Sequence, residues 1–414
     1  MTDGTTGTAA HRERPRAWDA MGHAAFRRLC VASYLDSFGT WTERLAVGWF
    51  VLDTTGSVFL AALSFAARSA PNMFLGPLGG AVADRFPRPR VLMLSTSAKS
   101  VLTYVLAMFG FMQLDSAWPV LLVVALSSVA RTSEQATIQA LIGDIVGPAR
   151  AAGAISLHAS GVRIVALVAS AGSGFLLKAS GPGPVFLMAA STAALAALVY
   201  STLRVARAAR PHSRTRLSLW GDAVEGLRIV LRIPVVLTLL LLAVAIEVFA
   251  FSYQSLMPAL ADRVLRVDAT GLGLLTFGAS LGGVLGMLAL TQLVDVVRRG
   301  LLMTVVTTAF AVSLLALAMS DRFLVSFGLM VVIGSMAAMF DALQWALLQA
   351  SVPDEVRGRV IGLWTTAIGF GWLGPVVLGA TAEVFGTRSA VAAGGAVALV
   401  VAGIAAASPR LRRL

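Results

Sequence analysis

Long uncharged stretches recur along this chain and constrain its fold more than any other feature. The runs Leu121–Val129, Val235–Ile246 and Val391–Ala407 contain no charged residue. A stretch of about 20 apolar residues crosses a bilayer as a helix, because lipid offers no partner for backbone N–H and C=O groups. The chain is only 13% charged, against roughly 25% in soluble domains. The sequence therefore predicts an all-α membrane protein.

The apolar blocks and the polar segments between them predict about twelve spanning helices. We place these spans at residues 29–52, 57–82, 91–113, 118–143, 151–177, 184–203, 234–260, 271–294, 300–319, 323–350, 358–384 and 388–407.

The basic residues are distributed unevenly between the two sides of these spans. The N-terminal arm, the even-numbered connections and the tail carry 23 arginines, and the odd-numbered connections carry 5 basic residues. This pattern predicts that both termini are cytoplasmic. The net charge of +12 is then a topology signal, with membrane lipids as partners and no role in binding nucleic acid.

The longest connection divides the chain near its middle. We expect a cytoplasmic arm over residues 1–24, a six-helix bundle over 25–204, a cytoplasmic linker over 205–233, a second six-helix bundle over 234–408 and a cytoplasmic tail over 409–414. The linker repeats apolar residues at helical spacing, which favours an amphipathic helix on the membrane surface over a solvated linker. The residues on that face are Leu217, Trp220, Val224, Leu227 and Leu231.

The two halves resemble each other in sequence. Val146-Gly-Pro-Ala-Arg150 follows the fourth span, and Val352-Pro-Asp-Glu-Val-Arg357 follows the tenth. A six-plus-six repeat predicts two bundles related by an axis along the membrane normal, with a cavity between them. We expect helices one, four, seven and ten to line this cavity.

A short motif after the second span carries a family resemblance. Residues 79–90 read GGAVADRFPRPR, which resembles the G-x-x-x-D-R-x-G-R signature of the major facilitator superfamily, with Pro87 where glycine is usual. The matching positions are Gly80, Asp84, Arg85 and Arg88. The resemblance implies the twelve-helix major facilitator fold, and it implies that these residues stabilise one conformation of the transport cycle.

Other segments resemble the export-type subgroup that contains enterobactin and macrolide exporters. These segments are Phe38–Leu52, Thr54–Ser57 and Val356–Val360. The resemblance implies a secondary transporter that exports drugs, antibiotics or siderophores by alternating access, in exchange for protons. Such activity would give multidrug efflux or antibiotic resistance. Many antiporters of the superfamily carry a Gly-Pro motif in helix five, but Val165–Leu177 has no proline.

Five acidic residues fall well inside the predicted spans, all on helices one, four, seven and ten. They are Asp36, Glu43, Glu134, Glu247 and Asp341. Charge at bilayer depth costs about 2.5–3.5 kcal/mol on insertion scales and is usually retained for function. Our hypothesis is that one or more of these acids takes up and releases a proton. The alternative is structural pairing, for example of Glu43 or Asp36 with Arg163 or Arg44, and of Glu134 with Arg131 three residues earlier.

Aromatic and amide side chains on the same helices are candidates for substrate contact. They are Trp41, Phe251, Tyr253, Gln254, Gln344 and Trp345. Amphipathic ligands are held by apolar contact with a few polar anchors. The acids favour a cationic substrate, and Arg44 and Arg131 leave an anionic one open. The alternative is that these aromatic side chains face lipid.

Several other functions are alternatives to export. No metalloprotease, nucleophile-elbow or phosphate-loop motif is present, so we expect no enzyme, no cofactor and no metal site. Import of a small metabolite with protons is the nearest alternative, and a membrane sensor or scaffold without transport is another. We expect the protein to act as a monomer.

Overall fold

Helices account for almost all of the computed structural model, which describes residues 17–205, 228, 230, 231, 233–293, 298–353 and 356–407. The described helices form twelve long rods, some of them built from consecutive segments. Most of the predicted interfacial helix in the linker, and all of the tail, lie outside the described residues.

The first half contains six rods. They are α1 (Ala24–Thr55), α2 (Val58–Arg85), α3 (Arg88–Phe111), α4 with α5 (Ala117–Arg131 and Glu134–Val146), α6 (Pro148–Ser180) and α7 (Pro182–Ser201), preceded by the short 3₁₀ helix η1 (Ala17–Gly22).

The second half contains the other six. They are α9, η2, α10 and η3 (Pro234–Ala245, Ile246–Ala250, Tyr253–Ala259 and Leu260–Val264), α11 (Ala269–Leu293), α12 (Arg299–Met319), α13 (Phe323–Ala350), α14, η4 and α15 (Arg357–Gly369, Phe370–Trp372 and Leu373–Phe385) and α16 (Thr387–Ala407).

Ten of these rods are long and apolar enough to cross a membrane by length and composition alone. The remaining two are α1 and the α4–α5 rod. Six charged side chains interrupt the 32 residues of α1. The turn at Thr132 and Ser133 divides the fourth rod into helices of 15 and 13 residues. The two rods that look least like membrane spans therefore carry three of the five predicted acids.

Two turns of π-helix interrupt the seventh rod. The first, η2, contains Glu247, and the second, η3, follows Pro258 in α10. Proline removes a backbone donor and disturbs the helical ladder, and π-helical turns are frequent at functional sites. The seventh rod is therefore deformed where its one predicted acid lies.

Glycines let neighbouring helices pack closely within a bundle. α11 lies directly against α13, and a methyl group at Gly334 of α13 would overlap the carbonyl group of Ala279 in α11. Small residues promote this approach in membranes, where helices associate through van der Waals contact instead of the hydrophobic effect.

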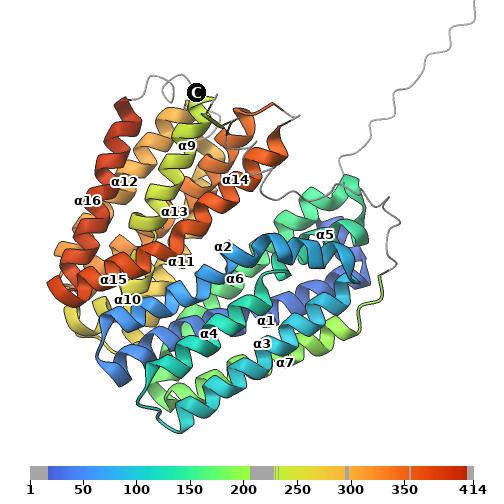
Figure 1. Ribbon diagram of the computed structural model, residues 1–414, viewed down its shortest axis with the longest axis horizontal. Helices are drawn as coiled ribbons and strands as arrows, with labels where there is room; N and C mark the ends of the chain where they lie inside the picture. The colour runs from blue at the N-terminus through green and yellow to red at the C-terminus, as the bar shows by residue number, and fades with distance from the viewer. Residues whose placement is uncertain are drawn as a thin grey trace, which may run out of the picture.

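The two groups of rods lie close together at one end and diverge at the other (Figure 1). Contact between them runs mainly through two helix pairs, α2 with α15 and α6 with α11. A Cβ atom at Gly174 of α6 would lie 2.5 Å from the carbonyl oxygen of Ala269 in α11. We call the end where the bundles meet the closed end. It contains the α1–α2 and α6–α7 turns and the segment after η3.

Polar contacts also join the bundles at the closed end. Lys178 pairs with Asp268 at 2.6 Å, and the guanidinium of Arg263 donates to the carbonyl oxygen of Gly56. The opposite end, which we call the open end, contains the α2–α3 and α5–α6 junctions. Pro148 and Pro353, from the two matching sequence motifs, both lie there, just before or at the start of α6 and α14.

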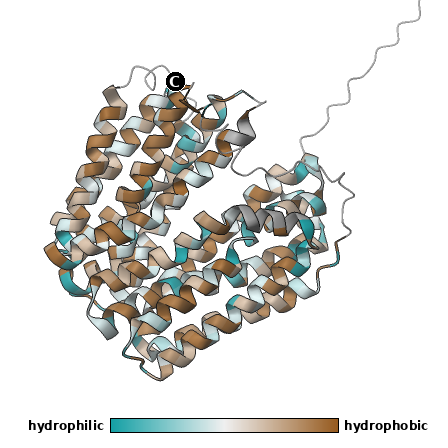
Figure 2. Ribbon diagram, viewed as in Figure 1, coloured by the Kyte–Doolittle hydropathy of each residue, from teal (hydrophilic) through white to brown (hydrophobic). Residues whose placement is uncertain are grey.

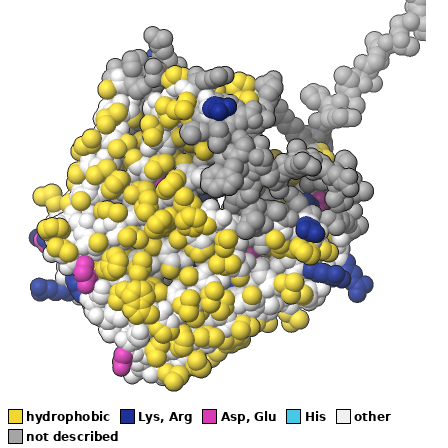
Figure 3. Space-filling view, viewed as in Figure 1, with side chains coloured by type: hydrophobic (Ala, Val, Ile, Leu, Met, Phe, Trp, Pro, Cys, Tyr) yellow, Lys and Arg dark blue, Asp and Glu magenta, His cyan; other side chains and the backbone are white. Residues whose placement is uncertain are grey.

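Apolar side chains cover the outer faces of the rods. Figure 2 shows hydrophobic residues along the flanks of both bundles, and Figure 3 shows charged side chains mostly towards the edges of the view. Large hydrophobic residues are exposed on many helices, among them Leu122, Leu198 and Ile404. This surface suits lipid, in which every backbone polar group must be satisfied within the helices.

Candidate functional site

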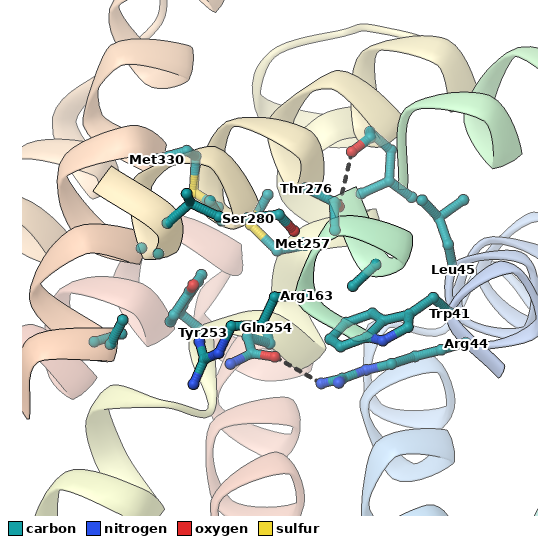
Figure 4. Close-up of a pocket in the computed structure, with 18 of the residues that line it drawn as sticks. Trp41, Arg44, Leu45, Arg163, Tyr253, Gln254, Met257, Thr276, Ser280 and Met330 are labelled. Carbon is teal, nitrogen blue, oxygen red and sulfur yellow. Dashed lines mark hydrogen bonds between the residues drawn. The ribbon is translucent and has the colours of Figure 1, made fainter. Parts of the chain in front are cut away.

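A pocket of about 280 Å³ lies between the two bundles. Its walls come from α1, α2 and α6 of the first bundle and from α10, α11 and α13 of the second. The side chains that Figure 4 labels are Trp41, Arg44, Leu45, Arg163, Tyr253, Gln254, Met257, Thr276, Ser280 and Met330. A site shared between bundles changes shape whenever the bundles move relative to each other.

Arg44 of α1 is held in place from both bundles. Its guanidinium donates to the amide oxygen of Gln254 at 2.6 Å, a contact visible in Figure 4. The same group lies 5.1 Å from the ring centre of Trp41 and 5.2 Å from that of Phe65. An arginine that stacks on aromatic rings loses little additional freedom when it binds an anion.

Arg163 and Asp341 add two more charges to the lining. Each lies in the middle part of its helix, α6 or α13, yet is exposed to the space between the bundles. The two side chains interact electrostatically, but they form no ion pair of 4 Å or less in the structure described. Charged residues in membrane spans usually face a bundle interior or a water-filled cavity, and these two follow that rule.

Glu247 lies close to the pocket without forming its wall. Its side chain sits against Gly371, where an added Cβ atom would approach the Glu247 Cγ to 2.8 Å. It interacts electrostatically with Asp341 and with Arg44. Of the five predicted acids, Asp341 lines the pocket and Glu247 is its neighbour.

The other three acids are paired inside the first bundle. Asp36 forms an ion pair with Lys99 of α3, whose Nζ also lies 3.7 Å from the Oε1 of Glu134. Glu134 pairs in addition with Arg131 at 3.8 Å, as the three-residue spacing predicted. We call Asp36, Lys99, Arg131 and Glu134 the buried charge cluster. Lys99 is only 2% exposed, so this cluster is a compact ionic core.

The suggested partners of Asp36 and Glu43 were wrong. Glu43 pairs with Arg68 of α2 at 3.0 Å, and Asp36 pairs with Lys99. The proposed partners, Arg44 and Arg163, instead face the pocket. Pairing depends on how each helix is rotated about its axis, which the charges within one helix do not reveal.

The expected set of lining helices also needs correction. No residue of α4 or α5, the fourth rod, is among the pocket's lining residues, whereas α2, α6 and α11 contribute. Glu134 of the fourth rod points towards α3 of the same bundle, where it pairs with Lys99. Helices one, seven and ten do line the pocket, as expected.

Three of the six candidate substrate contacts line the pocket and three do not. Trp41, Tyr253 and Gln254 line the pocket, whereas Phe251, Gln344 and Trp345 do not.

The three candidates outside the lining have other neighbours. Phe251 packs against Phe310, with ring centres 5.5 Å apart. Gln344 donates to the carbonyl oxygen of Leu239 at 3.0 Å. Trp345 lies against Trp364 at 4.9 Å. Lying on the same helix as an acid was therefore not enough to place a side chain in the pocket, because successive helical residues point in different directions.

The motif between α2 and α3 contributes one clear contact. Arg88 pairs with Asp144 of α5 and also donates to the carbonyl oxygen of Ala140 at 3.2 Å. Arg85 is exposed at the end of α2. Gly80 and Asp84 belong to α2, and their surroundings lie outside what the structure describes. The motif thus ties the third rod to the fourth at the open end.

Sequence reasoning missed several lining residues. Phe65, Thr276, Ser280, Met257 and Met330 line the pocket, but single hydroxyl, methionine and phenylalanine residues in apolar spans carry no distinctive signal. Arg68 and Lys99 could have been singled out as partners, because each is a lone cation inside an apolar span.

Comparison with curated proteins identifies siderophore transporters as relatives. The chain is 23% identical over 359 residues to a staphyloferrin A transporter of Staphylococcus aureus, covering 86% of this chain and 89% of that one. It is 26% identical over 348 residues to the enterobactin exporter EntS of Escherichia coli, covering 83% and 81%.

Solved structures of transporters share the fold. The nucleoside transporter NupG superposes with a TM-score of 0.76 at 16% identity, covering 93% of this chain and 98% of that one. A bacterial homologue of the lysosomal transporter Spinster, in an inward-facing and unoccupied conformation, superposes with a TM-score of 0.68 at 18% identity, covering 93% and 96%.

A family model described as "Transmembrane secretion effector" matches residues 16–414. The match spans both bundles. The chain belongs to the transmembrane secretion effector family of the major facilitator superfamily.

Proposed function

We propose that this protein exports small amphipathic molecules across a bacterial cytoplasmic membrane by alternating access. The observation that carries the proposal is the pocket between the bundles, which has walls from both halves. In the described part of the chain, the bundles meet mainly at one end, through α2 with α15 and α6 with α11. A site of this kind reaches the other side of the membrane when the bundles rock about it.

The distribution of arginines supports an orientation. Arg85, Arg88, Arg90 and Arg150 lie near the open-end junctions. By the positive-inside rule this end faces the cytoplasm, with both termini on the same side. The structure then corresponds to an inward-open state that is ready to load from the cytoplasm. A relative named as an enterobactin exporter supports export as the direction.

Proton exchange is the second part of the proposal. Asp36, Glu43, Glu134, Glu247 and Asp341 are the candidates to carry the proton, and the structure separates them into paired acids of the first bundle and two acids at the pocket. Replacing each acid with its amide and measuring proton-driven transport in everted vesicles tests this. Full coupled transport in all five variants would refute the exchange of protons through these groups.

An efflux assay tests export itself. The full chain is expressed in a bacterial host deleted for its own efflux pumps, and cellular accumulation of a panel of dyes, antibiotics and aromatic acids is measured. We expect lower accumulation of at least one compound, and loss of that effect in Arg163→Gln. Arg150→Gln is the matched control, because Arg150 lies on the same helix, exposed near the open end.

Two results would contradict export. Raised accumulation that depends on Arg163 would mean import of the compound. Unchanged accumulation of every compound, with normal amounts of protein in the membrane, would favour a sensor or scaffold.

A further inference from the structure

We propose that the pocket recognises an organic anion, with a carboxylate or phenolate oxygen held between Arg44 and Arg163 and an aromatic or apolar body packed beside them. The inference rests on the proposed transport function and names the class of substrate.

The two pocket arginines differ from the other lysine and arginine residues that lie within the predicted spans of the first bundle. Arg68, Lys99 and Arg131 each form an ion pair with a carboxylate. Within the described part of the chain, Arg44 and Arg163 form none. A cation at bilayer depth is expensive and is normally paired or functional. The two arginines that lack a protein carboxylate are the two that face the pocket.

Arg44 has donors available for a ligand. A guanidinium carries five N–H groups in a planar fork, and the one hydrogen bond described for Arg44 goes to Gln254. The guanidinium carbon also lies over the rings of Trp41 and Phe65, which restricts its position. The planar fork matches the geometry of a carboxylate. Arg163 places a second cation in the same lining, on α6.

The remaining walls suit a small apolar or aromatic body. Leu45, Met257, Leu272 and Met330 supply apolar contact, and methionine adapts to irregular shapes. At about 280 Å³, the pocket lies at the lower end of the roughly 300–1,000 Å³ usual for small-molecule sites. It therefore favours an occupant of one or two rings over a large macrocycle in this conformation.

The negative charge of Asp341 should affect an anionic and a cationic substrate in opposite directions. Among the described residues Asp341 is the one acid in the lining, and its charged neighbours are Arg163 and Glu247. A negative Asp341 competes with an anionic substrate for Arg163, so neutralising Asp341 strengthens anion binding. For a cationic substrate, the same change removes the attractive charge and weakens binding.

The effect of Asp341 on substrate binding also limits which acid can carry an exchanged proton. Exchange requires that the proton and the substrate weaken each other's binding, and such coupling is reciprocal. A proton on Asp341 would instead strengthen the binding of an anion. If the substrate is an anion, Asp341 is unsuited to carry an exchanged proton, and the buried charge cluster is the better candidate.

Binding of three matched probes tests the inference. 2-Naphthoate, 2-naphthamide and 2-naphthylmethylammonium share one ring system and differ in charge. Binding of each to the purified full chain in detergent is measured by isothermal titration calorimetry at two salt concentrations. The variants are Arg44→Gln, Arg163→Gln and Asp341→Asn, with Arg150→Gln as the control and size-exclusion profiles to verify folding.

We expect 2-naphthoate to bind at least about tenfold more tightly than the other two probes, as a charge-assisted hydrogen bond to arginine implies. Arg44→Gln and Arg163→Gln should each weaken its binding about tenfold, and Asp341→Asn should strengthen it. Arg44→Lys and Arg163→Lys keep the charge without the fork, and they serve as second variants if either glutamine variant misfolds.

A preference for the ammonium probe, weaker naphthoate binding in Asp341→Asn, or no binding of any probe would overturn the inference. Efflux in the pump-deleted host is a separate measurement. Efflux of cationic compounds alone would support the proposed export and contradict an anionic substrate. Arginine-dependent naphthoate binding with no transport of any compound would reject export while retaining the binding site.

Discussion

The carboxylate of Glu383 in α15 accepts a hydrogen bond from the backbone N–H of Phe59, in the first turn of α2, at 3.0 Å. On the other side of the same α1–α2 turn, Arg263 donates to the carbonyl oxygen of Gly56. Charged side chains of the second bundle thus hold a backbone turn of the first from both sides. We call these two contacts the turn clasp.

Replacing Glu383 should make it easier for the two bundles to separate at the closed end. A carboxylate at a helix N-terminus contributes about 0.3–1 kcal/mol at an exposed site, so Glu383→Ala should shift the closed–open equilibrium a few-fold towards opening. Spin labels at Asp115→Cys and Arg322→Cys, in a Cys30→Ala background, would report the distance across the closed end. Glu383→Gln keeps an acceptor and should behave more like the wild type. Identical distance distributions for Glu383→Ala and the wild type would contradict a role for the clasp.

The pair of Lys178 and Asp268 should make closure sensitive to acid. A hydrogen bond from Lys178 lowers the pKa of Asp268 below its ordinary 3.8. When the bundles separate and this bond is lost, the pKa returns towards that ordinary value. The pair therefore favours closure fully above about pH 3.8, and this contribution is lost as the pH falls through the lowered pKa.

Distance measurements with the same spin labels at pH 7 and pH 3 would check this. We expect the acid-induced opening to be smaller in Asp268→Asn, which is already neutral. Because both side chains are exposed, 0.5 M salt at pH 7 should reproduce part of the effect. Equal acid responses in Asp268→Asn and the wild type would count against the pair.

Lys99 should be essential for the stability of the first bundle. Lys99→Met leaves the half-buried Asp36 and the buried Glu134 without their shared cation, and breaking a buried pair in this way typically costs about 3–5 kcal/mol. We expect a lower thermal unfolding temperature in detergent, with partial recovery in Lys99→Met combined with Asp36→Asn and Glu134→Gln. Arg90→Met removes an exposed cation at the start of the same helix and should unfold like the wild type. A single Lys99→Met variant as stable as the wild type would refute the ionic core.

Two glycines of α13 offer a matched test of helix packing. Gly334 meets the backbone of Ala279, whereas an added Cβ at Gly328 would have nothing within 4 Å. Gly334→Ala should destabilise the protein by about 1–3 kcal/mol through overpacking, and Gly328→Ala should be neutral or slightly stabilising. Thermal unfolding of both variants would measure the difference. Equal unfolding temperatures would show that α11 and α13 can move apart without cost.

The sequence alone determined the class of protein and the positions of its spanning helices along the chain. In lipid, the backbone N–H and C=O groups must form their hydrogen bonds within the helix. Hydropathy therefore predicts the ends of the spans within a few residues, as for α12 at Arg299–Met319. The cost of charge at bilayer depth likewise marked Asp36, Glu134, Asp341, Arg44 and Arg163 as unusual. These are local properties, and they require no knowledge of the neighbouring helices.

Only the tertiary structure decided which of these charges pair and which face the pocket. Arg44 meets Gln254 from 210 residues away, and Lys99 lies between the acids of two other helices. Such contacts depend on the rotation of each rod about its axis and on the interlocking of helices at glycines such as Gly334 and Gly174. Packing between helices sets that rotation, and no periodicity within a single span records it.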